Sequence, residues 1–188
     1  MPWRNRSEKH LFSLTRSLTH VKASTSMASQ NRRISSIGTE KNGMMTAITD
    51  TFTEDHHRCD RLLAAAEASA GGSDWSVIGA AADALVTAMD RHFALEEDIV
   101  FPALVQVFLV AENPIEIMCN EHAQMRQLLA ELGDAVDTRD KSALLGILET
   151  LHFLVQQHNY KEEGIIYPMA DGALPERAAE MAAMIADA

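Results

Sequence analysis

The residue types best suited to metal chemistry occur in two stretches of the chain that share one spacing. Residues 92–102 are HFALEEDIVFP, and residues 158–168 are HNYKEEGIIYP. Each stretch begins with a histidine, has a glutamate four residues later (Glu96, Glu162) and ends with a proline. Residues four apart lie on the same face of a helix, so each pair can direct an imidazole and a carboxylate to one point. The spacing therefore predicts metal binding from two helices.

The repeat continues upstream of both stretches. His56 lies 36 residues before His92, His122 lies 36 residues before His158, and an acidic residue precedes each upstream histidine. The whole unit thus recurs with a period of 66 residues, which predicts two similar helical hairpins facing each other. A single His-xxx-Glu arises often by chance. Two such pairs, each with a histidine at the same distance upstream, indicate metal binding by the whole set. The predicted metal ligands are His56, His92, Glu96, His122, His158 and Glu162.

Both His–Glu pairs lie on apolar helix faces. The residues that share these faces are Leu85, Met89, Ile99 and Ala103 for the first pair, and Leu148, Leu151, Val155 and Ile165 for the second. A buried carboxylate is costly unless a cation meets it, and a metal ion would do so. We expect that removing the metal leaves two carboxylates packed together and raises their pKa values.

The chain has other histidines near these positions. His57 points about 100° away from His56, and the register of the repeat selects His56. His152 lies six residues before His158, off its face, and is placed outside the site. His57 is expected to be exposed or to lie beside a ligand.

Several acidic residues flank the predicted ligands. Asp55 and Glu121 either accept hydrogen bonds from metal-bound imidazoles or are solvated, and the sequence leaves both open. Glu97 and Glu163 are expected at the surface. Asp60, four residues after His56, could approach the site.

These motifs resemble the hemerythrin-like (HHE cation-binding) domain family, over roughly residues 46–168. Its members carry a histidine on helix 1, His-xxx-Glu on helix 2, a histidine on helix 3, and His-xxx-Glu or His-xxxx-Asp on helix 4. The resemblance implies an all-α bundle of four helices that holds a non-haem di-iron centre. Oxygen-carrying members have a second histidine where this chain has Arg126. The pattern is closer to symmetric sites in members linked to iron handling, nitric oxide chemistry or gas sensing.

Four imidazoles and two carboxylates can hold two metal ions about 3.5–4 Å apart, with both carboxylates shared. An oxo or hydroxo bridge would leave one open position on each metal for dioxygen, nitric oxide or peroxide. Iron is expected, and manganese or zinc is possible. The first hypothesis is a di-iron protein that binds or senses oxygen, nitric oxide or peroxide, or handles iron. It should react with oxygen and not release it intact.

Three alternatives stay open. A di-iron reductase or peroxidase acting on nitric oxide or hydrogen peroxide would need an electron donor, which the sequence does not identify. Whether the chain is an enzyme is therefore undecided. A ferritin-like di-iron carboxylate protein would use Glu-x-x-His pairs, and Glu54–His57 and Glu149–His152 have that spacing outside the repeat. A helical interaction module without a ligand is the remaining possibility.

Short connections between the expected helices predict an up-down-up-down bundle. Helices are expected over residues 46–68, 74–101, 114–136 and 140–167, with a short C-terminal helix from Pro175. The helix ends are predicted from Gly71-Gly72 after the first helix, from N-caps at Ser73, Asn113 and Asp140, and from a stop at Pro168. A break or kink is expected at Pro102, with a short turn of helix continuing to Val110. Cys59 and Cys119 flank the site at heights about 9 Å apart, too far for a disulfide.

The 188-residue chain has two parts of opposite charge. Residues 1–41 carry eight Lys and Arg and two acids, whereas residues 42–188 carry eight Lys and Arg and 25 acids. The acidic part argues against a nucleic-acid partner. The most apolar run, Ile99 to Val110, is too short to cross a membrane.

Residues 1–44 are predicted to be a disordered, basic, Ser- and Arg-rich tail before a bundle domain at 45–188. A start codon assigned too early is favoured over an organellar transit peptide, because Met44 and Met45 stand just before the first helix. The expected location is cytoplasmic, or organellar if the tail is a transit peptide. The oligomeric state is not predicted.

Overall fold

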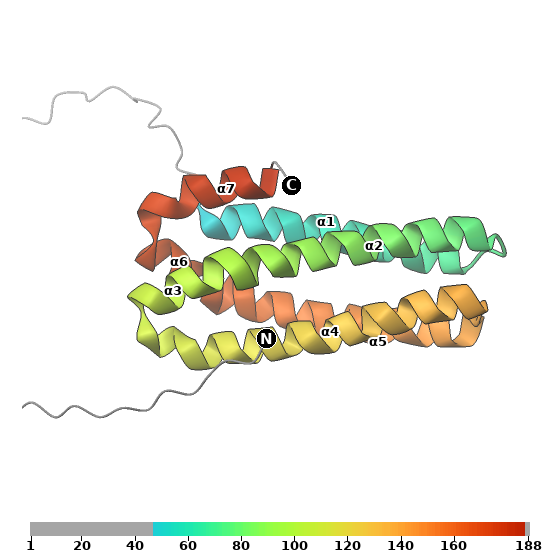
Figure 1. Cartoon of the computed structure of the whole chain (residues 1–188). Coiled ribbons are helices and arrows are strands. Elements are labelled where there is room, and N and C mark those ends of the chain that lie inside the picture. The colour runs from blue at the N-terminus through green and yellow to red at the C-terminus, as the bar shows by residue number, and fades with distance from the viewer. Residues whose placement is uncertain (1–46, 187–188) are drawn as a thin grey trace, which may run out of the picture. The chain divides into compact units, whose positions relative to one another are not determined.

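The computed structural model describes residues 47–186, and within them every element is a helix. The four long helices are α1 (Ile48–Ala70), α2 (Trp75–Leu95), α4 (Glu112–Thr138) and α5 (Lys141–Lys161). Helix α1 packs on α2, α2 on α4, α4 on α5, and α5 on α1 (Figure 1). The four helices thus close into a bundle, and the all-α prediction is confirmed. The predicted tail over 1–44 falls outside the described residues.

The connections at the right-hand end of Figure 1 are short. Gly71 ends α1, as predicted, and Asp140 caps α5 by accepting hydrogen bonds from the backbone of Ser142 and Ala143. The cap of α2 is Asp74, whose carboxylate binds the backbone N–H of Ser76, so the prediction of Ser73 was wrong by one residue.

Helices α2 and α5 each run into a π-helical turn. The first, η1 (Glu96–Val100), leads into α3 (Phe101–Val107), and the second, η3 (Glu162–Ile166), leads into α6 (Tyr167–Ala173). The short helix predicted after the break or kink at Pro102 corresponds to α3, whereas the predicted stop at Pro168 was wrong, because this proline lies in the first turn of a continuing helix. In each π turn a backbone N–H binds the carbonyl five residues earlier in place of the usual four. This change of pattern comes just before the proline, which has no N–H to donate.

Helix α4 begins at Glu112, after the 3₁₀ turn η2 (Leu109–Ala111). Asn113 is therefore inside the first turn and is not the cap that was predicted. The inward face of α4 is confirmed by six buried side chains: Ile115, Met118, His122, Met125, Leu129 and Leu132.

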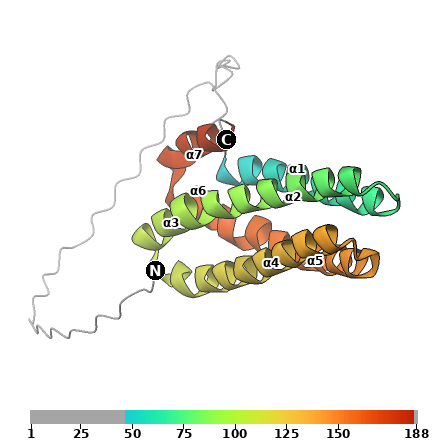
Figure 2. The same ribbon diagram turned by 45° about the vertical axis from the view of Figure 1, so that its right-hand side comes forward.

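The C-terminal segment covers one side of the bundle. After the 3₁₀ turn η4 (Pro175–Arg177), helix α7 (Ala178–Ala186) packs along α1, as Figure 2 shows from a second direction. Asp171 of α6 accepts hydrogen bonds from the backbone N–H groups of Ile48 and Thr49, which stabilises the start of α1. No helix in residues 47–186 has the length and apolar character needed to cross a membrane.

Candidate metal centre

All six predicted ligands are buried and meet between the four long helices. They form two groups of four residues. Within each group, the donor atoms all lie within 4.8 Å of one another. Each group contains two histidines from neighbouring helices together with the same two glutamates. The groups are His56, His92, Glu96 and Glu162, and His122, His158, Glu96 and Glu162. Glu96 and Glu162 thus belong to both groups.

The two shared carboxylates connect the groups atom by atom. Glu96 Oε2 lies 3.3 Å from Nε2 of His92 and 3.3 Å from Nε2 of His122. Glu162 divides its two oxygens, with Oε1 3.1 Å from His158 Nε2 and Oε2 3.2 Å from His56 Nε2. Each carboxylate therefore faces one histidine of each half of the chain, which is the arrangement that two bridging ligands need.

The cluster contains buried polar atoms with no hydrogen-bond partner among the described residues. These atoms are His92 Nε2, Glu96 Oε2 and Glu162 Oε1. Buried polar atoms in native proteins nearly always have a partner. Nε2 of His122 also lies 2.9 Å from Nε2 of His158, so the two nitrogens need a proton or a cation between them. The atoms left without partners are the ones a metal ion would bind, so the residues fit a metal site.

Four outer carboxylates hold the other nitrogen of each imidazole. Asp55 lies 3.0 Å from His92 Nδ1 and Glu121 lies 2.9 Å from His158 Nδ1. An Nδ1–H that donates to a carboxylate leaves the Nε2 lone pair turned into the cluster. Of the two possibilities left open for Asp55 and Glu121, the hydrogen-bonded one is correct.

Glu97 and Glu163, which were expected at the surface, also contact an imidazole Nδ1. Glu97 Oε1 lies 2.8 Å from His122 Nδ1, and Glu163 Oε1 lies 2.8 Å from His56 Nδ1. These contacts join the two halves of the chain across the bundle. The expectation failed because it assumed regular helices, whereas both glutamates lie in π turns. The signal was present in the sequence, since a Glu-Glu pair occurs at the same place in both repeats.

Cationic side chains support three of the outer carboxylates. Asp55 lies 3.3 Å from Arg58 and 3.8 Å from Arg91, and Lys161 pairs with the carboxylate that holds His158. Arg126 lies 2.7 Å from Glu97 and packs over the ring of Phe93. Arg126, which stands where oxygen-carrying members have an additional histidine, thus contacts the carboxylate of Glu97, and Glu97 in turn contacts His122.

The buried charges shift several pKa values. Burial alone would lower the pKa of His56, but its contacts with Glu162 and the nearby Glu96 raise that pKa to about 9. For His122, the carboxylates of Glu96 and Glu97 likewise outweigh burial and raise the pKa to about 9. Burial would raise the pKa of Glu162, yet its close contacts with the imidazoles of His158 and His56 hold that pKa well below its ordinary value. The expected rise was therefore wrong for Glu162, because imidazoles surround the carboxylate.

Tyr167 is the cluster residue that sequence reasoning missed. Its fully buried hydroxyl lies 2.5 Å from Glu96 Oε1, 3.1 Å from Glu162 Oε2 and 3.0 Å from His56 Nε2. Burial and the two carboxylates hold its pKa well above the ordinary value, so the hydroxyl keeps its proton and donates it. The π turn turns Tyr167 inward and leaves Ile165, which was expected there, 55% exposed. The aromatic residue five positions after each repeated glutamate was the available signal.

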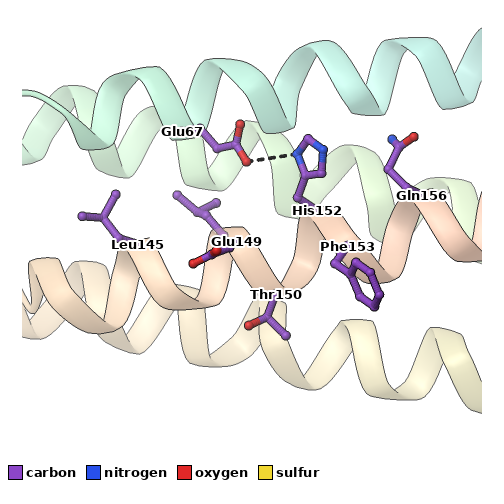
Figure 3. A pocket seen from close by; sticks show the side chains of 8 residues that line it. Glu67, Leu145, Glu149, Thr150, His152, Phe153 and Gln156 are labelled. Atoms are coloured by element: carbon purple, nitrogen blue, oxygen red, sulfur yellow. Dashed lines mark hydrogen bonds and ion pairs between the residues drawn. The ribbon is translucent and has the colours of Figure 1, made fainter.

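The remaining candidates lie away from the cluster. The side chain of His57 is 58% exposed, so the choice of His56 agrees with the structure. His152 of α5 points to Glu67 of α1, 3.1 Å away, in a surface pocket (Figure 3). Asp60 accepts a hydrogen bond from Gln156 and does not reach the cluster. With both of their histidines exposed, the Glu-x-x-His pairs do not form a ferritin-like site.

Both cysteines are free thiols, as predicted from their spacing. Cys59 is buried and Cys119 is half-buried. Burial, with Asp55 nearby, raises the pKa of the Cys59 thiol to about 12, so this thiol is unreactive at neutral pH.

The comparisons agree with this geometry. The family model described as the hemerythrin HHE cation-binding domain matches the chain over residues 47–170 and again over 113–187. The second match begins in α4, so the second half of the repeat is also recognised without the first. A comparison with curated proteins gives no match. Because the matched region includes most of the chain and all six clustered residues, this chain belongs to the hemerythrin HHE cation-binding domain family.

Proposed function

We propose that the chain is a non-haem di-iron protein that binds or senses oxygen, nitric oxide or peroxide, or handles iron. In this proposal the four long helices form the up-down-up-down bundle of the family. The metal ligands are His56, His92, Glu96, His122, His158 and Glu162. The observation that carries the proposal is that two groups of four buried donors share both of their carboxylates. Imidazole with carboxylate suits iron, and manganese or zinc is also compatible.

The side chains have separate roles in this proposal. The four imidazoles supply Nε2 to the metals, and Glu96 and Glu162 supply the shared carboxylates. The outer carboxylates keep the proton on Nδ1 of each imidazole, which fixes its orientation and increases its basicity. Iron, when bound, supplies redox chemistry and an electrophilic position for a small ligand. The surrounding apolar side chains exclude bulk water from the cluster.

One observation favours a reductase or peroxidase as the second candidate. Reduction of nitric oxide or peroxide consumes protons, and the protonated hydroxyl of Tyr167 touches the cluster. That hydroxyl can hold a proton at the place where the reaction would need one. An electron donor of unknown identity would still be required.

Metal content per chain, measured with the optical spectrum, tests the proposal. Protein loaded anaerobically with ferrous iron should hold two ions per chain and should change its spectrum on exposure to oxygen or nitric oxide. His56→Ala should lower the iron content, while its exposed neighbour variant His57→Ala should not. Wild-type protein that holds no iron, or a single zinc ion, would refute the proposal.

A second measurement separates the candidate functions. Oxygen is bound to the ferrous protein and its pressure is then lowered. We expect the ferrous spectrum not to return, because the site should react with oxygen. Full recovery over many cycles would identify a reversible carrier, and sustained peroxide consumption with an added reductant would identify an enzyme.

A further inference from the structure

The two halves of the cluster differ at one hydroxyl group. The 66-residue repeat pairs Tyr167 with Phe101, and each follows a π turn that begins at a shared glutamate. Both rings are buried, and each lies over a histidine from the other half of the chain. The ring of Phe101 is centred 5.8 Å from that of His122, and the ring of Tyr167 is centred 5.5 Å from that of His56. The rings occupy equivalent places, so the Tyr167 hydroxyl is the feature that breaks the symmetry.

This hydroxyl contacts both shared glutamates and the imidazole of His56, which belongs to one group only. The hydroxyl is within hydrogen-bond distance of three of the four side chains in the group of His56, His92, Glu96 and Glu162. The distances to those three range from 2.5 to 3.1 Å, so the oxygen already fills space beside this metal position. In the other group, Phe101 presents only carbon atoms at the equivalent place. The place beside His122 that corresponds to the Tyr167 hydroxyl therefore has no oxygen atom from this ring.

The outer charges are equal in number on the two sides but are distributed differently. Both carboxylates that hold His122 and His158 have a cationic partner, Arg126 in one case and Lys161 in the other. Glu163, which holds His56, has no Lys or Arg at ion-pair distance among residues 47–186. On that side both cations, Arg58 and Arg91, lie at Asp55, so the outer charges alone favour neither position.

We propose that Tyr167 makes the two metal positions unequal and directs a small anionic ligand to the position held by His122 and His158. The inference rests on the proposed di-iron function and extends it to the place of ligand binding. Tyr167 acts here as a positioning residue: its hydroxyl occupies the space beside His56 and hydrogen-bonds Glu96, while the equivalent place on the other side has no ring oxygen. The symmetric site expected from the sequence, with an open position on both metals, is replaced by a one-sided site.

The repeat itself supplies the matched variants. Tyr167→Phe removes the hydroxyl and makes the halves alike, whereas Phe101→Tyr adds a hydroxyl to the other half. The double variant Phe101→Tyr/Tyr167→Phe moves the hydroxyl across the cluster. The total number of aromatic rings stays constant in all three variants.

Azide titration of the iron-loaded ferric proteins tests the proposal, with heat release and azide-dependent absorbance as readouts. Wild type should bind one azide per chain and Tyr167→Phe should bind two. Phe101→Tyr should bind azide about tenfold more weakly or not at all, which corresponds to about 1.4 kcal/mol or more. The double variant should again bind one azide.

Iron content and melting temperature are measured first for each variant. Fewer than two irons in wild type would defeat the di-iron proposal itself. With two irons present, Tyr167→Phe that binds a single azide at wild-type affinity would overturn the role of Tyr167. A loss of azide affinity in Tyr167→Phe would also overturn it, since the hydroxyl would then stabilise the ligand. If Phe101→Tyr fails to fold, the comparison of wild type with Tyr167→Phe decides alone.

Discussion

The two ends of the bundle are stabilised in different ways. At the end where α1 turns into α2 and α4 turns into α5, the interior consists of apolar side chains, with Leu85, Leu132 and Leu144 fully buried among them. Toward the other end the same helices enclose four imidazoles, two shared carboxylates and one tyrosine hydroxyl, next to a second apolar cluster that includes Phe52 and Leu104. The apolar end is complete without an added group, whereas the polar end leaves buried donor atoms without partners. We therefore expect the stability of the polar end to depend on a bound cation, and that of the apolar end not to.

The largest expected effect is at a carboxylate that both metal positions share. Glu162→Ala should remove both ions and not only one, because Glu162 faces His56 in one group and His158 in the other. His158→Ala, which removes a donor from a single group, should leave one position bound more tightly than the other. Metal analysis of the purified variants measures this.

The control is Glu149→Ala, which changes an exposed glutamate of α5, the helix that runs into η3. This variant should keep two ions. If Glu162→Ala retained one ion at wild-type affinity, the carboxylate would serve only one metal.

A cavity at the apolar end should affect stability independently of metal. Leu132 is fully buried and lies ten residues beyond His122, about 15 Å along α4. Leu132→Ala should lower the free energy of unfolding by about 2–5 kcal/mol. Because the two sites are distant, the loss should agree within about 0.5 kcal/mol with and without metal, as measured by denaturant unfolding. A loss that appears only in the metal-free protein would show that the two ends are coupled.

The outer carboxylates should have a smaller effect, on metal affinity. Glu97→Gln weakens the hydrogen bond that orients His122 and should reduce metal affinity by about 10–100-fold. Competition against a chelator measures the affinity. The neighbouring Asp98→Asn changes an exposed side chain and should bind metal as wild type does. Equal affinities for the two variants would mean that Glu97 is only a surface charge.

The smallest effect concerns pH and the metal-free protein. The pKa values of His56 and His122 are raised to about 9, so their protonated forms stabilise the fold below about pH 6.5. This stabilisation should be lost as the pH rises from about 6.5 through 9. Imidazoles bound to metal do not take up protons, so the loaded protein should not lose stability over this range.

Melting temperatures with and without a chelator, measured across that range, test the difference. Metal binding at pH 7 should also release a proton from each of the two histidines, which calorimetry in buffers of different ionisation enthalpy detects. A metal-free protein that is most stable at pH 9 would contradict the ion pairs in the cluster.

The six clustered residues could be predicted from the sequence because their positions depend on local spacing. Histidine and glutamate four residues apart share a helix face, and the 66-residue repeat selected His56 over His57 without knowledge of the packing. The partners Glu97 and Glu163 and the hydroxyl of Tyr167 were not accessible in that way. Their positions depend on π turns, and a π turn changes which residue faces inward by one position. The repeated Glu-Glu pair and aromatic residue marked these positions but did not indicate which way the side chains face.

The long helices were also predicted well, but their ends were not. Proline was taken as a stop at Pro168, a rule that assumes the regular i→i−4 pattern up to the proline. The start of α1 depends on Asp171, which is distant in sequence and adjacent only in the folded chain. Local rules cannot supply a partner of that kind.

The central claim is that Glu96 and Glu162 are shared by two metal ions, and its most direct test is a crystal structure of the iron-loaded protein with anomalous diffraction at the iron edge. We predict two anomalous peaks about 3.5–4 Å apart between the two glutamates. One peak should lie next to His56 and His92, and the other next to His122 and His158. A single peak, or two peaks that share neither carboxylate, would contradict the account.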